Sequence, residues 1–213
     1  MALLQAMPAA AQSQASAPSK PPFEVYVVGG LNSATMSTPL PEVSIPELSF
    51  SQGRLTGFVG GVLLDVPLPA ARVAIETGGL LSFKGFTMKA SVMDLGSAKV
   101  TTKMTYLDVP ALVRGDLVRS RSTVVQVLGG ATLGLRLSAS LRGTVEGVSQ
   151  TESITSETST VDLGLTVAGR VAFGRGLAEV RYTHGLLNVA TEIGPDDETI
   201  KHRVLSFMGG WRF

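Results

Sequence analysis

Two histidines and no cysteine limit the chemistry open to this chain of 213 residues. His184 falls on the apolar side of an alternating run, where an imidazole facing lipid beside a serine could hydrolyse lipid esters. Such catalysis needs a nucleophile within hydrogen-bonding reach of its base, and a third group that orients the base. The sequence places no serine and no acidic residue level with His184 on the same face, so no Ser–His–acid set is visible. We therefore expect His184 to lie near the lipid headgroups, and predict no catalytic residue.

Glycine pairs and one acidic turn are the other candidate ligand sites. Gly-Gly pairs occur five times, at 29–30, 60–61, 78–79, 129–130 and 209–210. No predicted helix follows them and no Gly-Lys-Ser/Thr sequence occurs, so they indicate packing space and bends in strands instead of phosphate loops. Asp196, Asp197 and Glu198 lack the ligand spacing of an EF-hand. No cofactor and no metal site are therefore predicted.

Eleven charged side chains form the strongest candidate site, because all of them fall on one face of alternating runs. Acids and bases are nearly balanced on that face. The residues are Glu24, Asp65, Glu76, Asp108, Arg114, Arg136, Asp162, Arg170, Glu179, Arg181 and Arg212. Losing one partner of a buried ion pair costs about 3–5 kcal/mol, so enclosed charges should be paired. We expect a lumen charge network that plugs the interior; a proton or ion path is the alternative interpretation.

Eight runs of alternating polarity carry these residues. The runs lie near residues 23–36, 54–68, 72–86, 102–115, 123–138, 160–173, 177–189 and 200–213. Short turns alternate with long connections, and the long ones are predicted outer loops at 37–53, 87–101, 139–159 and 190–199. This alternation on an even strand number is typical of outer-membrane barrels. The sequence predicts an all-β fold, an eight-stranded antiparallel up-and-down transmembrane β-barrel over residues 23–213.

The apolar side of each run indicates which medium surrounds the barrel. Leu107 and Val109 fall on one face of their run, and Asp108 and Arg114 fall on the other. The second face mixes small residues, glycines and isolated charges, which suits a tight interior. We predict an apolar exterior in lipid and a polar plugged interior, since eight strands enclose just enough room for side chains. A soluble barrel of lipocalin type is the alternative, with the opposite polarity.

Composition agrees with a membrane barrel. Charged residues make up 16% of the chain and the mean hydropathy is +0.29, whereas soluble domains are about 25% charged. No window of about 18 consecutive apolar residues occurs, so a transmembrane helix is not expected. The net charge is +1 and the basic residues are scattered, which argues against a nucleic-acid partner.

The two ends of the sequence resemble targeting segments. Residues 1–22 begin with a short apolar segment that ends in small residues and continues into a Ser, Ala and Pro-rich stretch. We interpret them as a remnant signal peptide and linker. Phe207, Trp211 and Phe213 share one face of the last run, and aromatic side chains favour the membrane interface.

Several short motifs recur in one order and carry a family resemblance. They are Tyr106-Leu107-Asp108-Val109-Pro110, Arg181-Tyr182 with Gly185, Leu186 and Asn188, Gly57-Phe58 with Gly61, Lys84-Gly85, and Asp162 with Gly164. On these residues the chain, from 23 to 213, resembles the PorT-like outer-membrane β-barrel family, relatives of the small OmpA/OmpX-type barrels. The resemblance implies an outer-membrane location in a Gram-negative type cell envelope. It also implies that the terminal aromatic residues form the membrane-insertion signal that the barrel-insertion machinery reads.

We therefore expect a non-enzymatic outer-membrane protein with a structural or surface-interaction role through its outer loops. Its expected partners are outer-membrane lipids, the barrel-insertion machinery, and a surface or periplasmic protein. Two alternatives stay open. One is an accessory component of a protein secretion or transport machinery, and the other is a lipid-modifying outer-membrane enzyme that uses His184.

Overall fold

The computed structural model describes residues 23–37, 48–69, 72–92, 96–145, 148–153, 159–187 and 201–213. The strands are β1 (Glu24–Ser37), β2 (Leu48–Pro67), β3 (Val73–Val92), β4 (Gly96–Arg119), β5 (Thr123–Val145), β6 (Val148–Ser153), β7 (Val161–Phe173), β8 (Gly176–Gly185) and β9 (Lys201–Arg212). The predicted signal remnant and linker, residues 1–22, and the predicted loop 190–199 lie outside the described residues. No helix long and apolar enough to cross a bilayer occurs among the described residues.

The sheet closes on itself, and all its strand pairs are antiparallel. β1 pairs with β2 on one side and with β9 on the other, while β4 pairs with β5. The short β6 pairs with the far end of β5 and takes no part in the closed wall. Eight strands therefore form the cylinder, and the predicted eight-stranded up-and-down barrel is confirmed.

Side-chain burial alternates along the strands as the sequence predicted. On β7 the pattern alternates from Val161 to Arg170, where Val167 is 60% exposed and Arg170 only 1%. Large apolar side chains face outward around the barrel, among them Leu31, Phe58, Val113, Val127, Leu165, Val180 and Phe207. The predicted apolar exterior is confirmed, as lipid around the wall requires.

The interior holds more apolar side chains than the sequence interpretation assigned to it. One cluster lines a wall of the lumen and consists of Tyr26, Val28, Val59, Leu63, Leu80, Leu177 and Met208. A smaller cluster consists of Leu112, Leu128 and Ala168. These residues share the inward face with the charges and fill the space between ion pairs. Excluding water in this way strengthens electrostatic contacts in the lumen.

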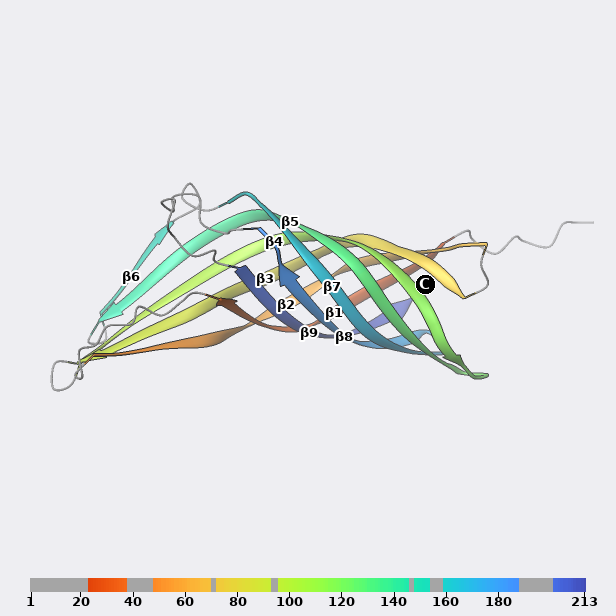
Figure 1. The fold of residues 1–213 in the computed structure, drawn as a ribbon, viewed down its shortest axis with the longest axis horizontal. Helices are drawn as coiled ribbons and strands as arrows, with labels where there is room; N and C mark the ends of the chain where they lie inside the picture. The colour runs from red at the N-terminus through yellow and green to blue at the C-terminus, as the bar shows by residue number, and fades with distance from the viewer. Residues whose placement is uncertain are drawn as a thin grey trace, which may run out of the picture.

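Four strands are longer than predicted, which corrects three of the predicted outer loops. Figure 1 shows β2 to β5 continuing as a sheet well beyond the ends of β1, β8 and β9. Leu48 pairs with Val92, and Val92 with Gly96, so residues 48–53 of the first loop and most of 87–101 are strand. Within 139–159, β5 and β6 form a hairpin. Beyond the apolar band Ser, Thr, Gly and Lys are common on both faces, so the alternation disappears although the backbone ladder continues.

Register shifts mark where this extended sheet (residues 48–54, 86–92, 96–105, 138–145 and 148–153) leaves the barrel. One lies between Arg54 and Val59 in the β2–β3 pair, and another between Thr105 and Tyr106 in the β4–β5 pair. Both lie at one height, because Ser82 pairs with Val59 and with Tyr106. Bulges bend strands and increase their twist, which accounts for the change of direction at this height.

Aromatic side chains gather at the end of the barrel that carries Glu24, Arg212 and the short connections, which we call the turn end. Phe23, Phe173, Trp211 and Phe213 are all exposed there. Gly176 pairs with Phe173 on one side and with Trp211 on the other. An outward belt of aromatic residues is typical of the membrane interface of such barrels. We call the opposite end, with the extended sheet, the loop end.

Gly61 and Gly29 offer a matched test of strand packing. A Cβ atom on Gly61 would overlap the carbonyl oxygen of Gly79 on β3, whereas one on Gly29 would meet nothing within 4 Å. Gly61→Ala should therefore lower the free energy of unfolding by about 1–3 kcal/mol, a usual cost of overpacking. Gly29→Ala should change it by less than about 0.5 kcal/mol. Urea unfolding in phospholipid vesicles, followed by Trp211 fluorescence, measures both; equal effects would contradict the close approach of β2 and β3.

Candidate functional site

An ionic cluster occupies the half of the lumen nearer the turn end. We call it the inner network, and its members are Asp65 on β2, Glu76 on β3, Arg114 on β4, Arg170 on β7, and Glu179 and Arg181 on β8. All six side chains are buried. Three arginines face three carboxylates, so the cluster is electrically balanced, as buried charges must be.

Arg170 lies at the centre of the inner network. Its Nη1 donates to Asp65 Oδ2 at 3.1 Å, its Nε donates to Glu179 Oε2 at 2.7 Å, and its Nη2 donates to Glu76. The Tyr26 ring lies alongside, with its centroid 5.6 Å from the guanidinium carbon. A cation beside an aromatic ring in a dry site gains further electrostatic attraction. One side chain thus joins carboxylates from three strands.

Arg181 and Arg114 complete the network. Arg181 donates from Nε to Glu179 Oε1 at 2.7 Å and from Nη2 to Glu76 Oε1 at 2.6 Å. Arg114 donates to Asp65. Each of the three carboxylates therefore contacts two arginines. Such shared pairs hold the opposite walls of the barrel together.

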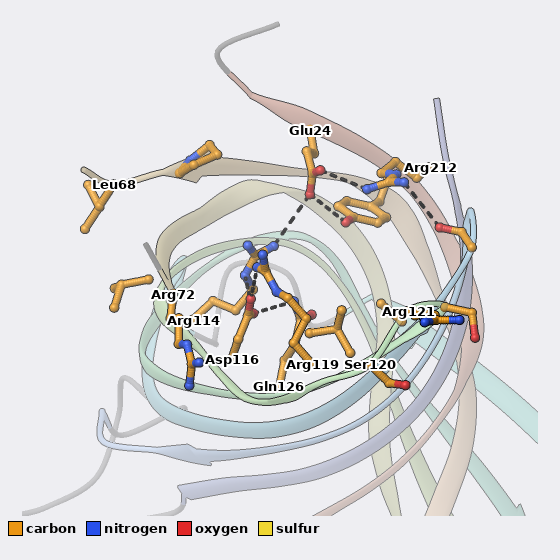
Figure 2. A pocket seen from close by; sticks show the side chains of 17 residues that line it. Glu24, Leu68, Arg72, Arg114, Asp116, Arg119, Ser120, Arg121, Gln126 and Arg212 are labelled. Carbon is orange, nitrogen blue, oxygen red and sulfur yellow. Dashed lines mark hydrogen bonds and ion pairs between the residues drawn. The ribbon is translucent and has the colours of Figure 1, made fainter. Parts of the chain in front are cut away.

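Ion pairs continue from Arg114 to the mouth of the barrel at the turn end (Figure 2). Arg114 Nη1 lies 3.8 Å from Glu24 Oε2. Glu24 also accepts a hydrogen bond from Arg212 Nη1 at 2.8 Å and one from the Tyr26 hydroxyl at 3.0 Å. Arg212 in turn donates to the carbonyl oxygen of Gly174 at 3.2 Å. These contacts join β1, β4 and β9 with the β7–β8 turn.

Asp116 forms a second group at the mouth. It accepts hydrogen bonds from Arg119 and from Gln126 Nε2, the latter at 2.8 Å. Its Oδ1 also lies 3.8 Å from Arg114 Nε. The sequence interpretation missed Asp116, although it follows Arg114 by two residues and so has the same parity along β4. Extending the alternation by one step would have found it.

A separate ionic pair lies in the half of the lumen nearer the loop end. Lys84 Nζ donates to Asp108 Oδ1 at 2.8 Å and lies 4.7 Å from the centroid of the Tyr106 ring. Lys84 was not among the predicted lumen residues and appeared only in the Lys84-Gly85 motif. It is nevertheless the ionic partner of Asp108, which was predicted to lie in the lumen. The parity of β3 places Lys84 on the same face as Glu76, so this signal too was present in the sequence.

Arg136 and Asp162 lie at the level of this pair. Arg136 Nη1 donates to the carbonyl oxygen of Ser159 at 2.9 Å. Asp162 is buried, and a Cβ atom on Gly134 would meet the side chains of both Asp108 and Asp162 at 3.1–3.3 Å. The glycine therefore leaves room for two carboxyl groups. All eleven predicted lumen residues thus face the interior or its mouth.

Threonines fill the lumen between the two ionic levels. The hydroxyl of Thr166 lies 2.7 Å from that of Thr132 and 3.0 Å from that of Thr183. A void of about 20 Å³ beside Thr132 and Thr183 is bounded by Lys84. This volume suits about one water molecule. Among the described residues, side chains therefore fill most of the lumen at this level.

Neither histidine has the surroundings of a catalytic base. His184 is half-buried, and its Nδ1 lies 3.5 Å from the Tyr182 hydroxyl. Within the described residues no serine hydroxyl or carboxylate is hydrogen-bonded to it. His202 is buried in the lumen, where its Nε2 lies 3.5 Å from the Tyr106 hydroxyl. The contacts of His184 give no support to a lipid-modifying centre.

The outward face of the extended sheet is a second candidate site. It bears four exposed basic side chains, which we call the basic face: Lys89 on β3, Lys99 and Lys103 on β4, and Arg142 on β5. Lys89 lies directly opposite Lys99, and Arg142 lies opposite Thr101 between the two lysines of β4. No acidic residue of the described strands shares this face. Glu152 on β6 pairs with Leu141, whose side chain lies on the opposite face of the sheet from Arg142.

A comparison with protein families agrees with this architecture. A family model described as "Outer membrane protein beta-barrel domain" matches residues 10–191. A closed barrel with an apolar exterior and an enclosed charge network is what an integral outer-membrane protein requires. The chain belongs to this family of outer-membrane β-barrels, and its location is the outer membrane. No curated protein sequence gives a significant match. The PorT-like assignment stays a prediction.

Solved structures of outer-membrane barrels resemble the fold at low sequence identity. Ail of Yersinia pestis, in complex with the heparin analogue sucrose octasulfate, is 12% identical with a TM-score of 0.44, over 90% of this chain and 99% of that one. Neisserial surface protein A is 12% identical with a TM-score of 0.42, over 89% and 97%. OprG of Pseudomonas aeruginosa is 13% identical with a TM-score of 0.36, over 89% and 95%.

Proposed function

We propose that this protein is a non-enzymatic surface-interaction protein whose basic face binds the sulfate or phosphate groups of anionic carbohydrate. The observation that carries the proposal is the direct pairing of Lys89 with Lys99, next to Lys103 and Arg142. Like charges directly opposite each other destabilise a sheet. A polyanion lying across these strands would replace that repulsion with attraction.

The extended sheet supports the proposal because it lifts the basic face away from the bilayer. Short connections of outer-membrane barrels lie on the periplasmic side and longer ones on the extracellular side, so the loop end should face the medium. Phe83 is an exposed apolar residue on the outward face of β3. Lys89 follows it by six residues, a distance of roughly 20 Å along a strand. The basic face therefore extends from Lys103, which pairs with Gly85 just beyond Phe83, to Lys89 farther from the bilayer.

The filled lumen supports a surface role in another way. The inner network and the threonine level occupy the interior with buried, paired groups. Eight-stranded barrels hold side chains in this space and leave none for passage of large solutes. Binding at the exterior is therefore the better-supported activity, and the interior acts as a structural plug.

Replacing all four basic side chains by glutamine tests the proposal. The protein, purified in nanodiscs of zwitterionic lipid, is titrated with a heparin-derived oligosaccharide by calorimetry. The quadruple variant of Lys89, Lys99, Lys103 and Arg142 should bind at least about tenfold more weakly, as four exposed charge contacts of several tenths of a kcal/mol each would give. Raising the salt concentration should weaken binding of the unaltered protein more steeply than that of the variant.

The turn end supplies the control. Arg72, Arg121 and Arg175 are exposed arginines at that end, and their joint replacement by glutamine should change the oligosaccharide affinity by less than about twofold. An equal loss in both variants would mean that net charge alone attracts the polymer. Undetectable binding by the unaltered protein would also contradict the proposal.

Two further partners of the protein are proposals of the same kind. Phe207, Trp211 and Phe213 lie exposed on the outer side of the barrel, which supports contact with outer-membrane lipids and with the barrel-insertion machinery. An accessory role in secretion, which the PorT-like resemblance implies, would use the short turns. No contact among the described residues favours that role over surface interaction.

A further inference from the structure

A cavity of about 600 Å³ opens at the turn end, beneath the inner network (Figure 2). Its volume lies within the range of small-molecule sites. Five arginines and two carboxylates line this turn-end cavity: Arg72, Arg114, Arg119, Arg121, Arg212, Glu24 and Asp116. The lining thus differs from the lumen above it, where acids and bases balance.

Two of the five arginines account for the excess of positive charge. Arg114, Arg119 and Arg212 each contact a carboxylate. Arg72 and Arg121 form no ion pair with any described residue. Among the described residues, the cavity therefore carries about two positive charges that its lining does not neutralise.

Gln126 adds a hydrogen-bond acceptor to the same cavity. Its side chain is buried, at 4% exposure, and its Nε2 donates to Asp116 Oδ1 at 2.8 Å. Because a carboxylate can only accept, this contact fixes the amide with its nitrogen toward Asp116. Gln126 Oε1 is then left buried without a hydrogen-bond partner. A buried acceptor of this kind calls for a donor from outside the protein.

We propose that the turn-end cavity binds a phosphate monoester that also carries a hydroxyl group. Arg72 and Arg121 line the cavity from opposite sides (Figure 2). Rotation of these exposed side chains would bring both to the phosphate, whose oxygens a planar guanidinium matches in pairs. Gln126 Oε1 would accept a hydrogen bond from the hydroxyl. The phosphate of a monoester carries a charge of about −1.5 to −2 at neutral pH, which matches the two surplus arginines. A single carboxylate would leave one of them uncompensated.

This chemistry can come from two sources. One is a soluble phosphorylated metabolite of the periplasm, and the other is lysophosphatidic acid in the adjacent leaflet, a lipid whose phosphate is also a monoester next to a free glycerol hydroxyl. The cavity opens beside the aromatic belt at the turn end, because Gly174 of its lining directly follows Phe173. Both sources therefore have access to it, and the shared ligand chemistry is phosphate next to a hydroxyl.

Calorimetric titration with glycerol 3-phosphate tests the proposal on the full barrel in phosphatidylcholine nanodiscs. The unaltered protein should bind saturably with one site, and the joint replacement Arg72→Gln and Arg121→Gln should weaken binding by about tenfold or more, because both charge-assisted contacts are lost. Lys201→Gln with Arg203→Gln removes the same charge at the start of β9, away from both the cavity and the basic face, and should change the affinity by less than about twofold. Equal heat-modifiable migration on gels would show that all variants are folded.

Three results would overturn the proposal: no saturable binding, an equal loss in both double variants, or malonate binding as tightly as glycerol 3-phosphate. A second series, in nanodiscs that contain lysophosphatidic acid, identifies the source. If glycerol 3-phosphate then binds more weakly to the unaltered protein, the lipid headgroup occupies the cavity. If its affinity is unchanged, the ligand is a soluble phosphate ester.

Discussion

Arg170→Met should lower the free energy of unfolding by about 3–5 kcal/mol, the cost of removing one partner from a buried ionic cluster. The Arg170 side chain has no exposed surface and contacts three carboxylates, Asp65, Glu76 and Glu179. Methionine conserves much of the volume, so the loss reflects the charge more than a cavity. Urea unfolding in phospholipid vesicles, followed by Trp211 fluorescence, measures the change.

Two companion variants separate the ionic contribution from general disturbance. Arg121→Met alters an exposed arginine and should change stability by less than about 0.5 kcal/mol. Adding Glu76→Gln to Arg170→Met should restore part of the lost stability, because two arginines would then face two carboxylates. If Arg170→Met were as mild as Arg121→Met, the inner network would contribute nothing to the fold.

Val167→Arg should destabilise the protein by about 2–4 kcal/mol, the cost of an arginine on the lipid face near the bilayer midplane. Val167 is 60% exposed and lies midway along β7, between Val161 and Phe173. If water surrounded the barrel, the same substitution would change the free energy of unfolding only slightly. Vesicle-based unfolding titrations measure the difference between the variant and the unaltered protein.

Val161→Arg is the matched comparison. Val161 also faces outward, at 40% exposure, but it begins β7. It lies six residues from Val167, roughly 20 Å along the strand. The cost there should fall to about 0–1 kcal/mol, because an arginine near the interface reaches the headgroups. Equal costs at both positions would contradict a depth-dependent lipid environment.

The sequence was sufficient to place the interior charges because a strand has only two faces. Asp108 and Arg114 alternate with Leu107 and Val109, and one of these sets had to meet lipid. Charges on the lipid face are costly, so they had to take the other side. This reasoning required no knowledge of which strands are neighbours. It therefore predicted eleven of the charged residues of the lumen and its mouth, without Lys84 and Asp116 and without the pairing.

Pairing depends on register, which alternation does not contain. Arg170 and Asp65 are 105 residues apart, and their contact follows from the stagger of the closed barrel. The extended sheet could not be predicted for a related reason. Lys89 and Lys99 lie in segments that are polar on both faces, so their strands have the composition of loops. The basic face becomes visible only when the register brings Lys89 opposite Lys99.

The inward charges also divide unequally between the two halves of the chain. The first half, β1 to β4, contributes five acids and two bases: Glu24, Asp65, Glu76, Asp108, Asp116, Lys84 and Arg114. The second half, β5 to β9, contributes two acids and four bases: Asp162, Glu179, Arg136, Arg170, Arg181 and Arg212. Each half alone would leave ions uncompensated against hydrocarbon, so a partly assembled barrel is unfavourable in the bilayer. Mutual attraction of the halves favours all-or-none assembly, and polypeptides divided between β4 and β5 should recombine with each other more readily than with their own copies.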